Sequence, residues 1–552
     1  MKKWFALVAL VLVLAILISA CSNAATSTTT TTTSPTTTAP TTTTSKPPTS
    51  TTPTSTTPAT PTPVKGGDLI IVRNTGTNSV GGAPQDIPQY TGTFLLTSPA
   101  LETLVLTDNQ ENIVPWLASS VDQSADGKTI TFHLRQGVKF HDGTDFNAAA
   151  VKYNLDAAVK ANAAGTANLS SVASMEVVDN YTFRMNLKNY DARLLVSMAQ
   201  LGYAVMCSPT ALAKATTPEN APKDHIVGTG PFKFDSWSKD QFVKFVRNDN
   251  YWQAGKPYVN SITIRNNPTV ATSLMSFKAG EVNMVENIDP SDYVSLKAQG
   301  YAVAIPTTLA FVFSMLPDSA VADSPFAKLE VRQAAEYAID KVGMANGIGQ
   351  GTQFAATQLS SPSNGWYLKD YPARNFDVAK AKALLTTAGY PNGFTYPMIA
   401  DVRMRQDQTV ALQSYLKDVG INLTLDVADV ARITSLQQNG WKGLMVPGFP
   451  NWSSFSSWTN RFVSTTITYP SAATPPGWKD GWNAVIAEPD YNKRMTAMQT
   501  LLKQVYDQAL IIPYIYDAPR YVTDGRIMDM AWDTRNLNGY FAADNVWLAP
   551  KK

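Results

Sequence analysis

The sequence predicts several layered α/β domains rather than one compact unit. Its 552 residues exceed what one hydrophobic core usually supports, and about 150 residues per domain gives about two to four domains. Strand and helix patterns alternate over several hundred residues, and we find no solenoid-like repeat. These three observations together indicate helices packed on sheets in more than one domain.

Composition limits the classes of partner. The chain carries 45 Lys and Arg residues against 43 Asp and Glu residues, for a formal charge of +2, and 44% of its residues are hydrophobic. No long basic run occurs outside the extreme N-terminus. A nucleic-acid partner is therefore not expected, because such proteins gather positive charge in patches.

The N-terminus has the form of a secretion signal. Lys2 and Lys3 precede an apolar run over residues 4–18, and small residues follow. We predict a lipoprotein signal peptide over residues 1–20. The letters LISAC end at Cys21 and resemble the bacterial lipobox, in which the cysteine is lipidated and begins the mature protein. The alternative is an uncleaved membrane anchor, because the run approaches the length of a spanning helix.

Residues 21–65 consist almost entirely of Thr, Ser, Pro and Ala. Such a segment cannot bury enough apolar surface to offset the entropy of ordering, so we predict a disordered tether. Only Cys21 and Cys207 are cysteines, and lipidation of Cys21 would leave no pair for an intramolecular disulfide.

Strand patterns begin directly after the tether. Residues 68–72 form a short apolar run behind a Gly pair. Farther on, Ile130, Phe132 and Leu134 alternate with Thr131, His133 and Arg135, which is typical of a half-buried strand whose polar face, Arg135 included, points outward. The turn at residues 136–137 and the apolar residues 138–140 then predict a hairpin.

Helix signals are equally local. Asp377 can cap a helix over residues 378–388, and Gly389 can provide its left-handed end. Apolar residues at 412, 415, 416 and 419 share one helix face that starts near Gln408 and stops at Gly420. Residues 421–427 then alternate as a strand.

Several motifs occur in a fixed order along the chain. The most specific are PWLA at 115–118 and DGKTITFHLRQGVKFHDG at 126–143. VGTGPF at 227–232, NDNYW at 248–252 and FKAGEV at 277–282 follow. The C-terminal half adds VRQA at 331–334, YAID at 337–340, and AKALL with AGYP at 381–391. These motifs and their order resemble family 5 of the bacterial extracellular solute-binding proteins, the peptide, nickel and oligosaccharide receptors of ABC importers.

This resemblance implies a two-lobe α/β fold, similar to the type II periplasmic binding proteins, with an extra subdomain inserted in the first lobe. We expect the first lobe over residues 66–101, 225–308 and 511–552, and the inserted subdomain over residues 102–224. The second lobe is expected over residues 309–510.

The resemblance also implies the activity. We expect a lipid-anchored protein on the extracytoplasmic face of the cell membrane that binds an oligopeptide-like or other polar oligomeric solute between the lobes. It would deliver the solute to an ABC permease and its ATPase, acting as a monomer. An oligosaccharide or nickel-chelate receptor of the same importer class stays open. A ligand sensor without transport and a secreted hydrolase are the alternatives from other classes.

An aromatic, turn-rich stretch in the second lobe is the first candidate for ligand contact. Rings provide contact area at little entropic cost, and amides and hydroxyls orient a ligand. The candidates are Trp441, Asn451, Trp452 and Phe455, with core packing as the alternative for Trp441. Peptide-binding members carry an aspartate in this loop for the peptide's amino terminus. Residues 451–457 contain no acid, which argues against a free α-amine.

Other candidates follow the opening strand, lie near the lobe crossing or precede the helix that starts near Gln408. Arg73 and Asn74 follow the first strand, at the edge where relatives line the cleft, and Phe313 lies near the crossing, where hinge packing explains it equally well. Arg403 and Arg405 resemble the position of an arginine that receives a peptide carboxylate in some relatives. Solvated charges at a helix end are the alternative for both.

The sequence contains few patterns that are typical of catalytic or metal-binding sites. The three histidines, His133, His141 and His225, do not pair with each other or with a cysteine at ligand spacing. No nucleophile elbow and no His-Glu-x-x-His motif occurs. We therefore expect no cofactor, no metal site and no enzymatic activity.

Overall fold

The computed structural model describes most of the chain after the predicted tether. Residues from Thr62 to Lys552 belong to one compact unit, and residues 1–61 lie outside the described residues. The described ranges are 62–73, 94–108, 112–163, 166–200, 202–217, 220–267, 269–306, 311–362, 365–447, 469–531 and 542–551.

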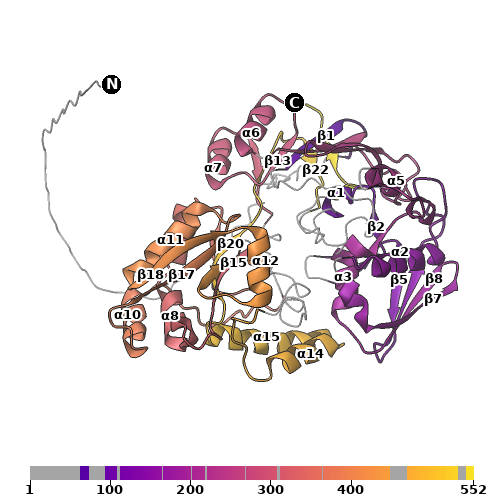
Figure 1. Cartoon of the computed structure of the whole chain (residues 1–552). Coiled ribbons are helices and arrows are strands. Elements are labelled where there is room, and N and C mark those ends of the chain that lie inside the picture. The colour runs from indigo at the N-terminus through magenta and orange to yellow at the C-terminus, as the bar shows by residue number, and fades with distance from the viewer. Residues whose placement is uncertain are drawn as a thin grey trace, which may run out of the picture. The chain divides into compact units, whose positions relative to one another are not determined.

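The first lobe is built on a mixed sheet. Seven described strands pair in the order β10-β11-β12-β1-β13-β21-β14, and β1 runs parallel to both β12 and β13. Helices α6 (Val270–Lys278) and α7 (Pro290–Ala298) lie beside β13 (Figure 1) and bury apolar residues against this sheet. The strands are β1 (Asp68–Arg73), β10 (Phe232–Ser238), β11 (Phe242–Arg247), β12 (Ser261–Asn266), β13 (Met284–Glu286), β14 (Ala302–Ala304) and β21 (Tyr521–Thr523).

The inserted part of this lobe carries its own antiparallel sheet, in the order β5-β6-β8-β7. In β6 the side chains of Ile130, Phe132 and Leu134 are buried and the alternate residues are half-buried, which confirms the predicted strand. Its larger elements are β5 (Ala118–Gln123), β6 (Thr129–Leu134), β7 (Val172–Asp179), β8 (Thr182–Leu187), α2 (Ala148–Lys160) and α3 (Arg193–Gln200).

Three two-stranded sheets and several short helices complete the described part of the first lobe. β2 pairs with β9, β3 with β4, and β22 with β23, all antiparallel. These elements are β2 (Glu102–Thr103), β3 (Val105–Thr107), β4 (Ile113–Pro115), β9 (Val205–Met206), β22 (Ile527–Met528), β23 (Trp547–Leu548), α1 (Phe94–Thr97), α4 (Pro209–Leu212), α5 (Ala221–His225), and the 3₁₀ turns Thr166–Ser171 and Gly202–Ala204.

The predicted hairpin at residues 138–140 is wrong. β6 pairs with β5 and β8, and residues 138–140 form a loop that contains one isolated bridge, from Lys139 to Asp145. Val138 and Phe140 are buried in the core of the inserted part. Their apolar pattern therefore reflects a loop that folds under the sheet and not a strand.

The second lobe has helices on both faces of its sheet. Six described strands pair in the order β16-β20-β15-β19-β17-β18. Alternate residues of one strand enter different cores. Met398 of β17 packs with the helices at residues 329–347, 378–387 and 406–418, and its neighbour Ile399 packs with the helices at residues 430–439 and 478–507. The strands are β15 (Phe311–Pro317), β16 (Phe354–Ala355), β17 (Phe394–Asp401), β18 (Ile421–Ala428), β19 (Leu444–Val446) and β20 (Ile512–Asp517).

The helices of this lobe include both predicted ones. Asp377 caps α10 by accepting a hydrogen bond from the Lys380 amide (2.8 Å), and Gly389 after it has φ +87°. α11 ends before Gly420, which has φ +98°, and β18 follows. The helical elements are α8 (Leu329–Tyr337), α9 (Lys341–Gly347), α10 (Val378–Thr387), α11 (Gln406–Asp418), α12 (Val430–Asn439), α14 (Trp478–Ala487), α15 (Tyr491–Asp507) and the 3₁₀ turn Pro325–Ala327.

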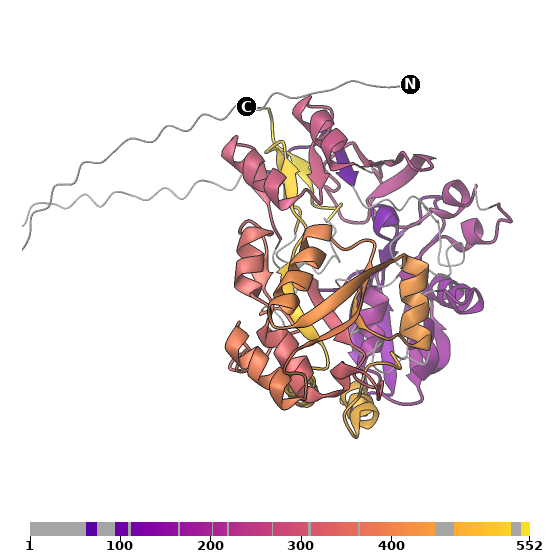
Figure 2. The same cartoon turned by 60° about the vertical axis from the view of Figure 1, so that its left-hand side comes forward.

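Two crossings connect the two large sheets. The chain leaves the first sheet after β14 and enters the second at β15, and it returns from β20 to β21 through residues 518–520. The yellow C-terminal segment in Figures 1 and 2 follows this return. The architecture is thus α/β with two lobes, whereas the exact lobe boundaries given above stay a prediction.

Candidate ligand-binding site

A buried pair of charged residues lies at the carboxyl ends of two parallel strands in the first lobe. Ligands of open α/β sheets bind at such ends. Arg73 closes β1, Glu286 closes the neighbouring β13, and Arg73 Nε lies 2.8 Å from Glu286 Oε2. Both side chains are largely buried, at 13% and 5% exposure. Burial raises the pKa of Glu286, and the Arg73 charge opposes that rise.

A second buried ion pair stabilises the return crossing between the lobes. Arg520 Nη1 bonds to Asp517 Oδ1, and Arg520 Nε donates to the Ile288 carbonyl oxygen, 2.9 Å away in the first lobe. Asp517 Oδ2 accepts a hydrogen bond from Gln353 Nε2 (2.8 Å). Arg520 thereby ties the end of β20 to the segment behind β13, so both lobes meet at one polar cluster.

Two predicted arginines follow β17 in the second lobe. Asp401 at the end of this strand is 1% exposed and accepts from Arg403 Nε (2.9 Å) and Arg403 Nη2 (2.5 Å). Arg405 precedes α11 and donates to Asp407 at 3.1 and 2.6 Å, and these bonds lower the pKa of Asp407. Arg405 Nη1 also lies 3.6 Å from Asp289 Oδ1 of the first lobe, so this ion pair spans the two lobes.

The two described aromatic candidates are packed among core side chains. Phe313 on β15 is half-buried, and its ring centroid lies 6.4 Å from that of Tyr514. Trp441 is 4% exposed and meets the Tyr469 ring edge-on, with 6.3 Å between centroids. A ligand role for either residue stays a prediction.

The remaining candidates cannot be placed. Asn74, Asn451, Trp452, Phe455 and Cys21 all lie outside the described residues. In the sequence, Asn74 follows directly after β1, and the aromatic loop follows β19. Both therefore come after the carboxyl end of a strand, where ligands of open α/β sheets bind. Their roles also stay predictions.

The structure adds acidic residues that the sequence analysis missed. Glu286, Asp289, Asp401 and Asp517 each contact one of the arginines around the crossing. A usable signal was present, because Glu286 and Asp401 each end an apolar strand. Among the described residues, no group of three or more His, Cys, Asp or Glu side chains is arranged to hold a metal ion.

The model for "Bacterial extracellular solute-binding proteins, family 5 Middle" matches residues 112–469. This match covers more than half of the chain. The chain belongs to family 5 of the bacterial extracellular solute-binding proteins. Within the described residues, none of the helices combines the length and the apolar character that a membrane crossing requires.

The curated relatives include glutathione-binding proteins of several bacteria. The chain is 34% identical to the glutathione-binding protein GsiB of Escherichia coli O1:K1 over 343 residues, which is 61% of this chain and 65% of that protein. It is 33% identical to GsiB of Pectobacterium atrosepticum over 382 residues, which is 66% of this chain and 71% of the relative. The match to the first of these spans slightly less than two thirds of its length.

Solved structures show the same two-lobe type II fold. NikA from Brucella suis in complex with Fe(III)-EDTA aligns with a TM-score of 0.75 at 22% identity, covering 88% of this chain and 100% of NikA. DppA from Helicobacter pylori in complex with the peptide STSA aligns with a TM-score of 0.71 at 22% identity, covering 88% and 98%. The predicted fold class and family are therefore confirmed.

Proposed function

We propose that this chain is the substrate-binding receptor of an ABC importer, and that its solute is glutathione or another short peptide-like molecule. The observation that carries this proposal is the 33–35% identity to glutathione-binding proteins over 337–382 residues. The receptor would hold its solute between the two lobes and release it, chemically unchanged, to the permease and ATPase.

Arginines around the crossing are the groups that would receive the carboxylates of a peptide-like solute. Glutathione carries two carboxylates and one ammonium group at neutral pH. Arg73 ends a sheet strand on one side of the crossing, Arg403 and Arg405 follow one on the other side, and each guanidinium is already paired with a carboxylate of the protein. A solute carboxylate would therefore bind the remaining guanidinium nitrogens or replace the protein's own carboxylate. Residues 451–457 contain no acid, so the ammonium group of glutathione would be received by another part of the cleft.

Closure of the lobes would couple binding to delivery. A ligand that contacts both lobes favours the closed form only by its differential affinity, and moving from 1:99 to 99:1 closed needs about 5.5 kcal/mol. The Arg405–Asp289 pair is a described contact between the lobes, so it would make or break as the lobes move.

Reduced glutathione should raise the thermal unfolding temperature of the purified full chain. A ligand at about 100 times its dissociation constant stabilises the folded state by about 2.7 kcal/mol. Differential scanning fluorimetry with glutathione, tripeptides and tetrapeptides measures the shift. Maltotriose and an equimolar mixture of glutamate, cysteine and glycine serve as controls. No shift with any peptide, or a shift with maltotriose alone, would contradict a peptide-type receptor.

We also propose that Cys21 is lipidated and anchors the protein. Support comes from the lipobox-like residues 17–21, and stable anchoring would need two or more acyl chains because one binds only marginally. Cys21→Ala should abolish incorporation of labelled palmitate and release the chain into the soluble fraction. Cys207→Ala, which alters the buried second cysteine, should keep the label. Equal labelling of both variants would refute lipidation at Cys21.

A further inference from the structure

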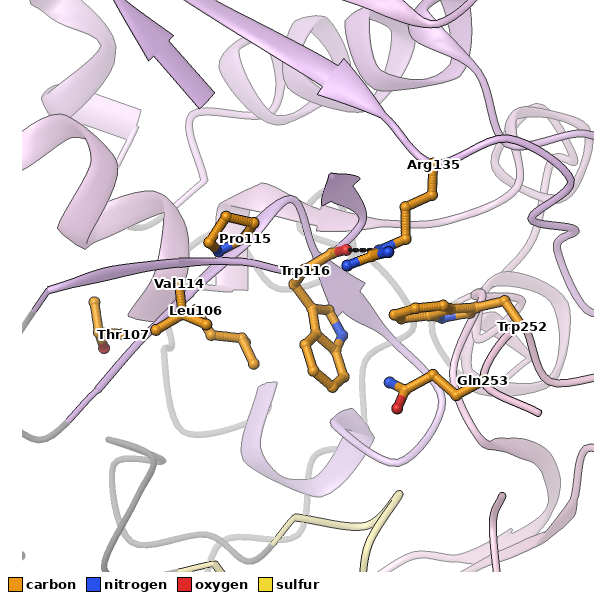
Figure 3. A pocket seen from close by; sticks show the side chains of 8 residues that line it. All are labelled: Leu106, Thr107, Val114, Pro115, Trp116, Arg135, Trp252 and Gln253. Atoms are coloured by element: carbon orange, nitrogen blue, oxygen red, sulfur yellow. Dashed lines mark hydrogen bonds between the residues drawn. The ribbon is translucent and has the colours of Figure 1, made fainter. Parts of the chain in front are cut away.

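A pocket of about 330 Å³ lies where the inserted part of the first lobe meets the segment after β11. This volume falls at the lower end of the range for small-molecule sites. Figure 3 shows apolar side chains on one side of it and two indole rings with a guanidinium on the other. Its described lining residues are Leu106, Thr107, Val114, Pro115, Trp116, Arg135, Trp252 and Gln253.

One buried carboxyl group fixes both indoles. Trp116 Nε1 donates to Glu102 Oε1 (2.8 Å), and Trp252 Nε1 donates to Glu102 Oε2 (3.0 Å). The rings meet edge to face, with 5.4 Å between centroids and an interplanar angle of 78°. Because Glu102 uses both indole N–H groups, the rings present only faces and carbon edges to the pocket. They form a rigid apolar wall for a flat molecule.

Arg135 provides the charge of the pocket. Its Nε donates to the Trp116 carbonyl oxygen (2.5 Å), and its guanidinium stacks 4.8 Å from the Trp252 ring centroid. Among the described residues, no acceptor is bonded to its two terminal nitrogens, and no acidic side chain lines the pocket. Arg135 is half-buried, so water screens this charge less than at an open surface.

From this geometry we propose that the pocket binds a small flat carboxylate, with its apolar body against the indoles and its carboxylate on Arg135. The carboxylate would bond to the terminal guanidinium nitrogens, and the apolar side chains across the pocket would cover the other face of the ring. Gln253 adds an amide at the rim. Its Nε2 already donates to Tyr251 and its Oε1 accepts from Lys256, so it is held in place.

We expect this site to be separate from the one between the lobes. Its walls come from β3, β4, the residue after β6 and the loop at residues 252–253, whereas the arginines discussed above follow β1 and β17. The proposal therefore does not depend on the solute that the receptor transports. A carboxylate bound here should persist when the inter-lobe site is filled.

Fluorine NMR of 4-fluorophenylacetate with the purified full chain tests the proposal. We expect line broadening that saturates, and at least about tenfold weaker binding of the isosteric neutral amide, 4-fluorophenylacetamide, because charge-assisted bonds to Arg135 are lost. Saturating glutathione should leave the dissociation constant within about twofold. Equal binding of acid and amide would refute the carboxylate preference, and displacement by glutathione would refute a separate site.

Two variants locate the probe. Arg135→Gln should weaken binding at least about tenfold, whereas Arg184→Gln, the same charge change on β8 of the same part, should leave it unchanged. Val114→Trp fills the pocket from an exposed rim position and leaves Arg135 in place, so it should also abolish binding. Circular dichroism confirms folding of each variant. Retained binding in Val114→Trp, or an equal loss in both arginine variants, would overturn the assignment.

Discussion

Replacing Glu102 with glutamine should lower the free energy of unfolding by about 1–3 kcal/mol, although the two side chains have nearly the same shape. The carboxyl oxygens of Glu102 accept from four described side chains: Trp116 and Tyr251 on Oε1, and Thr229 and Trp252 on Oε2. Each oxygen therefore faces one indole N–H, which can only donate. Whichever way a glutamine amide turns, its NH₂ group meets an indole donor and leaves it unsatisfied.

The size of this loss should depend on pH. Burial raises the pKa of Glu102 from 4.5 to about 7, against the opposing effect of its four donors. The folded protein thus binds this proton more tightly than the unfolded chain. The resulting stabilisation is full below about pH 4.5 and is lost as the pH rises through about 7, by up to about 3 kcal/mol. Glutamine cannot titrate, so the variant should fall short of wild type more at pH 5 than at pH 8.

Urea unfolding at both pH values, followed by tryptophan fluorescence, measures the difference. Glu281→Gln is the matched control, because Glu281 is exposed and has no described side-chain partner. It should change the unfolding free energy by less than about 0.5 kcal/mol. A Glu102→Gln loss that is larger at pH 8 than at pH 5 would show that the four donors outweigh burial and keep the carboxylate ionised.

Arg520→Met should destabilise the protein by about 3–5 kcal/mol, the usual cost of breaking a buried ion pair. Arg520 is 7% exposed and Asp517 is 9% exposed, so the substitution leaves a carboxylate inside the protein without its cation. It also removes the donor to the Ile288 carbonyl oxygen. Chemical unfolding of the full chain should show the loss.

An arginine nearby in the chain offers the control for that prediction. Arg526 pairs with Asp524 at 2.9 Å, with 25% and 23% exposure, and Arg526→Met should cost only about 0–1 kcal/mol because water already solvates part of this pair. If Arg520→Met costs no more than Arg526→Met, the ion pair at the crossing does not hold the lobes' connection together.

Local patterns predicted local structure well. The alternation at residues 130–134, the Asp377 cap and the Gly420 stop all appear where the sequence places them, since each depends on neighbours within a few residues. The failure at residues 138–140 has a tertiary cause. An apolar triplet is equally consistent with a strand and with a loop buried under a sheet, and sheet pairing decided between them.

The sites were harder to predict because their parts lie far apart in the chain. Arg135 was expected on an outward strand face, yet it stacks on Trp252, 117 residues later. Glu102 was not predicted to have a structural role, because in the sequence it is a single acid before a threonine. In the structure it accepts hydrogen bonds from residues up to 150 positions away. Sequence spacing alone could not identify the partners of either Arg135 or Glu102. By contrast, Arg73 was proposed because it follows the opening strand, and Arg403 because it resembles the position of a carboxylate-binding arginine in relatives. A ligand role for both residues stays a prediction.

Small-angle X-ray scattering of the full chain with and without reduced glutathione tests most directly whether the protein is a receptor that closes on a peptide-like solute. We predict a smaller radius of gyration with glutathione present and a return to the starting value after dialysis, with the glutathione recovered intact. Superimposable curves at a glutathione concentration that saturates binding would contradict lobe closure.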